Sequence, residues 1–279
     1  MSLSLIDKMN EAQKFIQTHS KLKPTIGLTL GSGLSSFANE IKVECQIPYH
    51  EIPHFVPPTV DGHPGSLLLG FAEGVPVAVL QGRIHYYEGH SLDQVTFATR
   101  LLKYMGIKLL VLTNAAGGMN PKMKPGDFMI IRDHINLTGL NPLRGPNIAE
   151  FGPRFPDMTE PYDKVFSDLL VKICKENKFS FLEGVYCGVQ GPCYETAAEI
   201  KYLQTIGGDA VGMSTVPETI VARHMRLQTV GVSCITNLAT GLSNSQVTHE
   251  EVKEVAARVE KQFASLILRF IKAAGTNLK

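Results

Sequence analysis

Residues 25–33 read Thr-Ile-Gly-Leu-Thr-Leu-Gly-Ser-Gly, a mostly apolar run that predicts a strand and ends at a serine between two glycines. Ahead of it, residues 5–16 carry apolar side chains at helical spacing, and Pro24 separates the two segments. Glycines after a strand let backbone N–H groups come close to an anion, and the hydroxyl of Ser32 adds a donor. A tight turn that binds nothing would have the same sequence, so other segments must decide between the two interpretations.

The rest of the chain alternates between strand and helix patterns. Residues 66–71 and 75–80 flank Glu73-Gly74 and predict a hairpin. Four more strands are predicted, at residues 109–112, 128–131, 185–189 and 229–235. Helices are predicted at residues 162–176 and after three capping boxes, Ser91/Gln94, Thr196/Glu199 and Thr248/Glu251. This alternation predicts an α/β fold with a largely parallel or mixed sheet, whose ligands bind beyond the strand ends.

The composition argues against several classes of protein. The 279 residues include 27 Lys and Arg against 26 Asp and Glu, so the basic excess of a nucleic-acid or membrane partner is missing. The five cysteines are an odd number without Cys-x-x-Cys spacing, and residues 1–10 lack the pattern of a signal peptide. Both features favour a cytoplasmic protein with reduced thiols. Residues 229–248 are uncharged, but their Ser, Thr, Asn and Gly content argues against a membrane span.

Some short motifs match known sites but fail in context. His50-Glu-Ile-Pro-His54 fits the zinc-binding pattern His-Glu-x-x-His, which needs a helix to bring both histidines onto one face. Pro53 is incompatible with that helix, so no metal site is expected. The turn after residue 30 lacks the third glycine of a dinucleotide-binding fingerprint, because Ser36 stands in its place. Neither a P-loop nor the Gly-x-Ser-x-Gly motif of hydrolases occurs.

The segment Gln81-Gly-Arg-Ile-His-Tyr-Tyr-Glu-Gly89 follows the second strand of the predicted hairpin. In an extended chain, Arg83, His85 and Tyr87 project to the same side. Arginine recognises phosphate through a planar pair of donors, and histidine can add a donor to the same anion. One arginine would also fit a solvated strand edge. Three polar side chains on one face beside glycines favour an anion-binding site.

Other segments place small or polar residues near predicted strand ends or helix starts. They are residues 112–119, 191–196, 211–217 and 233–237. Glu195 lies next to a helix N-cap, where a carboxylate either stabilises the helix or contacts a ligand. Asn237 ends a strand, and His249 lies in the first turn of the last helix, where the dipole favours the neutral imidazole. Residues 140–161 are rich in Gly, Pro and Asn, and irregular segments of that length are usually functional or disordered.

Together these segments resemble the trimeric, low-molecular-mass purine nucleoside phosphorylase family. The resemblance runs from about Gly31 to Glu251. Its motifs are Gly31-Ser-Gly33, Gln81-Gly-Arg-x-His85, Thr113-Asn-Ala-Ala-Gly-Gly118, Asn141-Pro-Leu-Arg-Gly-Pro-Asn147, Val211-Gly-Met-Ser-Thr-Val-Pro-Glu218 and Thr248-His-Glu-Glu251. It implies a single domain over residues 1–279, with a central mixed sheet between helices in three α/β/α layers, and a homotrimer.

The resemblance also implies residue roles. Phosphate would be held by Ser32, Arg83, His85, Ser214 and the backbone of Ala115, with His63 near its entrance. Ribose would contact Tyr87 and Met213, and its 5′-hydroxyl would contact His249. The catalytic residues would be His85, Glu195 and Asn237, of which the last two read the purine while Tyr194 packs on it. Phe155 would cover the site of a neighbouring subunit, so residues 140–161 would form a subunit contact and lid.

The implied reaction is reversible phosphorolysis of inosine, guanosine and their deoxy forms in purine salvage, with phosphate as co-substrate and no cofactor. The Asn237 amide can donate to O6 and accept at N7, and Glu195 can accept from N1–H, so 6-oxopurines are expected over adenosine. A 5′-methylthioadenosine phosphorylase would want an acid at position 237 and an apolar contact at position 249. A nucleosidase would need no phosphate cluster, and a catalytically inactive nucleoside-binding module would show no turnover.

Overall fold

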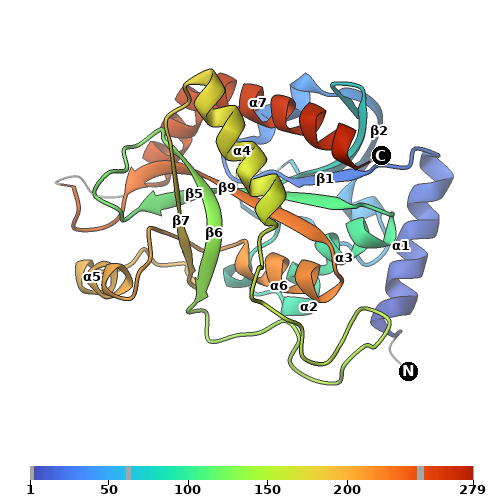
Figure 1. Ribbon diagram of the computed structural model, residues 1–279. Helices are drawn as coiled ribbons and strands as arrows, with labels where there is room; N and C mark the ends of the chain where they lie inside the picture. Colours follow the sequence, from blue (N-terminus) through green and yellow to red (C-terminus); the bar gives the residue numbers. More distant parts are fainter. Residues whose placement is uncertain (1–2, 61–63, 244–247, 279) are drawn as a thin grey trace.

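The computed structural model describes residues 3–60, 64–243 and 248–278. Within these residues, nine strands form one sheet (Figure 1): β1 (Ile26–Thr29), β2 (Lys42–Pro48), β3 (Ser66–Ala72), β4 (Val75–Gln81), β5 (Leu109–Gly118), β6 (Phe128–Asn136), β7 (Phe181–Gly188), β8 (Ala210–Gly212) and β9 (Gln228–Leu238). The α-helices are α1 (Leu5–His19), α2 (Leu92–Val95), α3 (Phe97–Tyr104), α4 (Lys164–Asn177), α5 (Ala197–Thr205), α6 (Val216–His224) and α7 (His249–Asn277). Short 3₁₀ helices are η1 (Ser35–Glu40), η2 (Tyr49–Glu51) and η3 (Tyr86–Glu88).

The strand order is β2-β3-β4-β1-β5-β8-β7-β6-β9, and β5 also pairs with β9. The neighbours β4, β1, β5 and β9 are parallel, whereas β2–β3 and β3–β4 are antiparallel pairs. Because β9 also pairs with β6, and β8 joins β7 to β5, one half of the sheet closes on itself. The carboxyl ends of the four parallel strands meet at one edge, which is where ligand sites form in such sheets.

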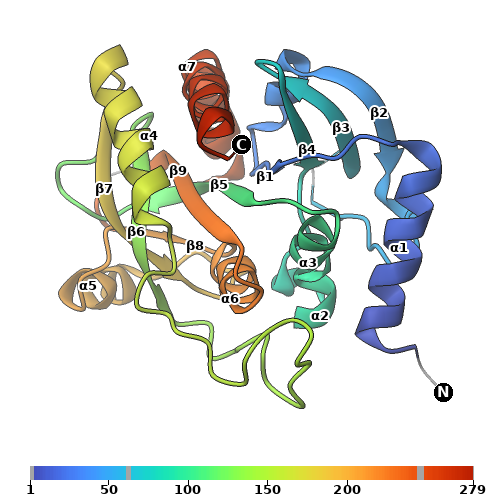
Figure 2. The same cartoon turned by 45° about the vertical axis from the view of Figure 1, so that its right-hand side comes forward.

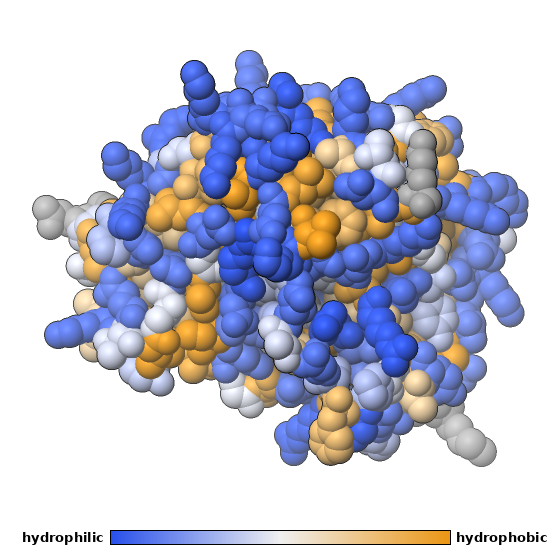
Figure 3. Space-filling model, in the orientation of Figure 1, coloured by the Kyte–Doolittle hydropathy of each residue, from blue (hydrophilic) through white to orange (hydrophobic). Residues whose placement is uncertain are grey.

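Both faces of the sheet are buried. Successive residues of β5 alternate between the faces, so that Leu109 and Val111 pack in the core under α4 and α7, and Leu110 and Leu112 pack with α1 and α3. Figures 1 and 2 show α4 and α7 on one side of the sheet and α3 and α6 on the other. Burial on both faces explains the almost continuous apolar runs of the strands. The arrangement confirms the predicted α/β fold, and Figure 3 shows hydrophilic side chains mixed with small apolar groups on the outer surface.

The strand β5 is longer than the predicted strand at residues 109–112. The small residues after it continue the strand, because residues 113–118 pair with β9. Gly118 is needed there, since a Cβ at this position would lie 2.8 Å from Cγ2 of Ile235. Among the strands and α-helices, β2, β8, α3 and α6 were not predicted.

The predicted geometry of residues 81–89 was wrong. The strand β4 ends at Gln81, Gly82 has a φ of 93°, and residues 86–88 form η3. A turn and a short helix, rather than alternation along a strand, therefore bring Arg83, His85 and Tyr87 into the same cavity. By contrast, residues 140–161 are irregular as predicted, without a helix or strand among these described residues.

Candidate active site

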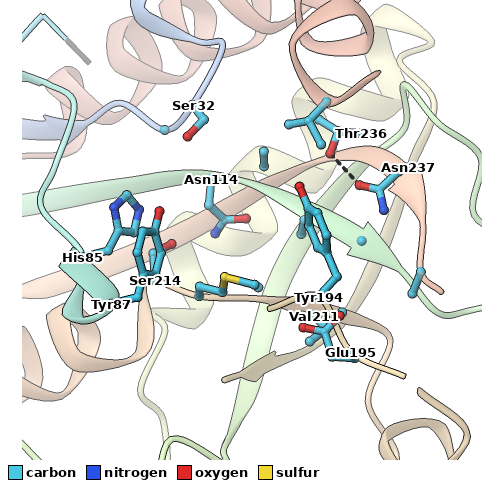
Figure 4. Close-up of a pocket in the computed structure, with 18 of the residues that line it drawn as sticks. Ser32, His85, Tyr87, Asn114, Tyr194, Glu195, Val211, Ser214, Thr236 and Asn237 are labelled. Atoms are coloured by element: carbon cyan, nitrogen blue, oxygen red, sulfur yellow. Dashed lines mark hydrogen bonds between the residues drawn. The ribbon is translucent and has the colours of Figure 1, made fainter. Parts of the chain in front are cut away.

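A cavity of about 130 Å³, partly open to solvent, lies where β1, β4, β5 and β9 end. Figure 4 shows polar side chains from separate elements around it. The predicted site residues that line it are Ser32, Arg83, His85, Tyr87, Ala115, Tyr194, Glu195, Met213, Ser214 and Asn237.

The turn after β1 brings Ser32 to the cavity. The backbone N–H of Gly31 donates to the hydroxyl of Thr113 on β5 at 3.1 Å. A Cβ on Gly31 would lie 2.7 Å from Cα of Asn114, so only glycine lets the two backbones approach this closely. Gly33 has a φ of 74°, in the left-handed region that favours glycine. The glycines therefore fix the position of Ser32 in the cavity wall.

Arg83 is held from two sides by the protein. Its Nη1 donates to Oε2 of Glu218 at 2.8 Å, and its Nη2 donates to the backbone carbonyl of Thr113. Glu218 also accepts from the backbone N–H of Thr215 at 2.9 Å. Both members of the ion pair are about 5% exposed, so their charges are largely removed from water. Such a hydrogen-bonded buried pair fixes the guanidinium in one orientation, because either charge alone would be poorly solvated.

His85 is oriented by Glu88. Its Nδ1 lies 3.0 Å from Oε1 of Glu88, while Oε2 accepts from the backbone N–H and hydroxyl of Thr59 at 2.7 and 2.6 Å. Burial would raise the pKa of Glu88, but the hydrogen bonds from His85 and Thr59 outweigh it and lower the pKa to about 2. An ionised carboxylate only accepts, so Nδ1 of His85 is the donor of this pair.

Two further side chains complete this end of the cavity. The ring of Tyr87 stacks on His85 with centroids 4.8 Å apart. Burial, and next the charge of Glu88, raise the pKa of Tyr87 to about 12, so its hydroxyl remains a donor at neutral pH. Ser214 precedes α6, and its Oγ lies 3.1 Å from Oγ1 of Thr215. Hydroxyl, imidazole and guanidinium groups thus gather at one end of the cavity, a donor set that suits an anion.

The other end of the cavity carries a carboxylate, an amide and an aromatic ring. The Asn237 amide accepts from Oγ1 of Thr236 at 3.0 Å (Figure 4). It donates to the carbonyl of Leu238 at 3.1 Å. An amide has two N–H donors and two oxygen lone pairs, so one of each remains for a ligand. Burial, and next the charge of Glu199, raise the pKa of Glu195. These groups match a flat heterocycle with both donors and acceptors.

The structure leaves three of the predicted site residues away from this cavity or undescribed. Phe155 is 86% exposed, does not line the cavity, and has the Arg154 guanidinium 5.8 Å from its ring centroid. His63 lies outside the described residues. His249 begins α7, but its side chain is also outside the described part of the structure.

Sequence reasoning missed four residues that shape the site. They are Glu88, Asn114, Thr236 and Glu218. Glu88 and Glu218 each follow an N-cap residue by three positions, and this capping-box spacing was a usable signal. Asn114 lay within a motif that was already noted, but nothing in the sequence showed that its side chain lines the cavity.

Other motifs have ordinary structural roles. His50 lies in η2, and His54 has a φ of 64° and pairs with Glu11, so no α-helix joins the two histidines. The described residues contain no group of three or more His, Cys, Asp or Glu side chains arranged to hold a metal ion. Among them there is also no helix that is long and apolar enough to cross a membrane.

Comparison with known proteins identifies the family. Residues 25–272 match the family model of the phosphorylase superfamily. The chain is 49% identical to purine nucleoside phosphorylase 1 of Bacillus subtilis (strain 168), over 94% of this chain and 96% of that protein. Crystal structures of Schistosoma mansoni purine nucleoside phosphorylase in complex with inosine and with adenosine both have TM-scores of 0.92 and 40% identity. They cover 98% and 97% of this chain, and 98% of each of those chains.

Proposed function

Because this chain belongs to the phosphorylase superfamily and is a purine nucleoside phosphorylase, we propose that its cavity cleaves inosine and guanosine with inorganic phosphate. The observation that carries this proposal is the meeting of two residue groups in one cavity: an anion-binding group around His85 and a base-binding group around Asn237. A ribose between them would present its anomeric carbon to the phosphate on one side and the purine on the other.

At the phosphate end, the proposed ligands are Ser32, Arg83, His85, Ser214 and the backbone N–H of Ala115. Phosphate lies beneath the anomeric carbon and stabilises the oxocarbenium character that develops as the glycosidic bond stretches. The electron pair of that bond leaves with the purine, and a phosphate oxygen then bonds to the anomeric carbon with inversion. Positioning and fixed charge supply most of the catalysis, so no covalent enzyme intermediate is needed.

At the base end, Asn237 uses its remaining N–H on purine O6, and its remaining lone pair accepts from N7–H once N7 of the leaving purine takes up a proton from solvent. The ionised Glu195 accepts from N1–H, and from the 2-amino group of guanine. Adenosine has no proton at N1, so this carboxylate is unmatched with adenosine, which predicts a preference for 6-oxopurines. Tyr194 packs on the base, and Tyr87, Met213 and His249 contact the ribose.

Hypoxanthine release from inosine, with and without phosphate, tests this proposal. Adenosine and 5′-methylthioadenosine serve as parallel substrates, because binding of adenosine in a relative does not report its turnover. We expect release only with phosphate and little from the two adenosines. Release without phosphate would indicate a nucleosidase, turnover of methylthioadenosine would indicate the related phosphorylase, and no turnover would indicate a binding module.

We also propose that three copies assemble and that Phe155 covers the site of a neighbouring subunit. Its exposed ring, on an irregular segment away from its own cavity, supports this role. Phe155→Ala should lower activity, whereas Val165→Ala, at a 70% exposed position on α4, should not. Equal activities of the two variants would contradict the role of Phe155, and a monomer in sedimentation experiments on the wild type would contradict the trimer.

The remaining expectations also belong to this proposal. The enzyme works in the cytoplasm as one domain, on small molecules rather than nucleic acid or membranes, and without a metal or organic cofactor. Activity that survives dialysis against EDTA would support the last point, and restoration by an added metal ion after its loss would contradict it.

A further inference from the structure

Asn114 is a buried polar residue of the cavity to which the roles proposed above assign nothing. It lies on β5, is 2% exposed and lines the cavity. Figure 4 shows its amide in the middle of the view, with His85 and Tyr87 on one side and Tyr194 and Asn237 on the other. Its side chain lines the same cavity as both groups, and its bond to Thr215 joins it to the side chain of Ser214 at the phosphate end.

The amide of Asn114 is held in a fixed orientation. Its Nδ2 donates to Oγ1 of Thr215 at 2.9 Å. Glu218 fixes Thr215 in turn, by accepting from its backbone N–H at 2.9 Å. The backbone of Asn114 pairs with Ser233 in β9 and packs against Gly31. Contacts within the protein thus fix both the backbone of Asn114 and the Nδ2 atom of its side chain.

The oxygen of this amide is left without a donor. Oδ1 of Asn114 is buried and accepts no hydrogen bond from any residue that the structure describes. A buried amide oxygen without a partner is unfavourable, so the site is completed by a ligand that donates. The opposite flip of the amide would place Oδ1 against Thr215 and lose the bond that Nδ2 donates. A bond to Thr215 would then require its hydroxyl to be the donor.

Phosphate and ribose are the two parts of the substrates that could contact this oxygen. Phosphate at neutral pH is mainly an acceptor and carries negative charge, which a carbonyl oxygen repels. Ribose carries one hydroxyl group on C2′, next to the anomeric carbon, and another on C3′. Each of them is a good donor. The sugar must also lie next to the phosphate, and Asn114 lines the cavity beside the proposed phosphate ligand Ser214.

We propose that Oδ1 of Asn114 accepts a hydrogen bond from the 2′- or 3′-hydroxyl of the ribose, which makes Asn114 a specificity residue. This inference rests on the proposed function. It predicts that the enzyme discriminates against the deoxynucleoside that lacks the bonded hydroxyl, because that substrate leaves the amide oxygen buried without a donor.

Asn114→Ala, assayed with inosine, 2′-deoxyinosine and 3′-deoxyinosine, tests the assignment. The preference in kcat/KM for inosine over one of the deoxynucleosides should fall about tenfold, whereas the KM for phosphate should not change. Asn177→Ala, at the end of α4, is the matched control and should keep the wild-type preference. If Asn114→Ala melts much earlier than the wild type, Asn114→Ser supplies the same measurement with a smaller loss of volume.

An unchanged preference with both deoxynucleosides would overturn the inference. If the KM for phosphate rose at the same time, the amide would instead contact the phosphate. Wild-type turnover of inosine separates this outcome from failure of the proposed function: without it both proposals fail, and with it only the role of Asn114 is rejected.

Discussion

The two ends of the cavity are built differently. At the phosphate end, Arg83 and Glu218 form an ion pair about 5% exposed, and His85 is fixed by a carboxylate that is itself anchored. At the base end, Tyr194 is 44% exposed, and Glu195 sits before the N-cap of a surface helix. The difference teaches that the anion site is held by buried, paired charge, whereas the base site combines the buried Asn237 with side chains that lie nearer solvent.

The largest expected effect concerns two glutamates in the same local motif. Glu218 and Glu199 both complete capping boxes, but only Glu218 also pairs with a buried arginine. Glu218→Ala should lower the free energy of unfolding by about 3–5 kcal/mol, because it leaves Arg83 buried without its counter-charge. Glu199→Ala, at the base end, should change it far less, as denaturant unfolding of both variants would show. Equal losses would break the comparison between the two ends.

Asn237→Ala should have the next largest effect, on catalysis. Loss of two hydrogen bonds to the purine, at about 1.4 kcal/mol each, predicts roughly a hundredfold lower kcat/KM for inosine. The KM for phosphate should stay near its wild-type value, since Asn237 lies at the other end. Asn177→Ala serves as the control for a loss of asparagine. Unchanged kinetics with inosine would remove the base-reading role.

Glu88→Gln should affect the phosphate end alone. The substitution keeps the shape but removes the charge that orients His85, so the KM for phosphate should rise about tenfold. Glu73→Gln, in the turn between β3 and β4, is a control that also loses a carboxylate. A rise in the KM for inosine with no change for phosphate would show that Glu88 does not act through the anion site.

The smallest expected effect is a difference in pH dependence between the two ends. The pKa of Glu195 is raised by burial, so as the pH falls this carboxylate is protonated at a higher pH than the usual value of about 4.3. The kcat/KM for inosine should fall through that range, because a protonated carboxyl no longer accepts well from N1–H. Glu88, with a pKa of about 2, stays ionised there.

Glu195→Gln sharpens the same test. The variant should lose the acid limb that belongs to Glu195 in the pH profile for inosine. In the wild type, kcat/KM for inosine and for phosphate could instead fall together as the pH is lowered. If Glu195→Gln showed the same fall, a group other than Glu195 would control activity at low pH.

Much of the fold and site followed from local signals. Strands such as β1 and β9 were visible because burial on both faces demands apolar runs, and glycine turns after them marked the edge where ligands bind. The α3 and α6 helices were missed, since the sequence there gave no start signal that was recognised. The prediction that Arg83, His85 and Tyr87 lie together was confirmed, but the predicted extended strand was wrong. A turn at Gly82 brings the three side chains into one cavity.

By itself, the sequence indicated several of the segments that line the cavity, since motifs such as Thr113–Gly118 and Val211–Glu218 carry small and polar residues that a plain core does not need. Only the tertiary structure decided how those residues are supported. Arg83 and Glu218 are 135 positions apart, and Asn114 and Thr215 are 101 apart, so no local pattern could pair them. Burial then gives these pairs their importance, because charges and amides removed from water must find partners wherever the fold places them.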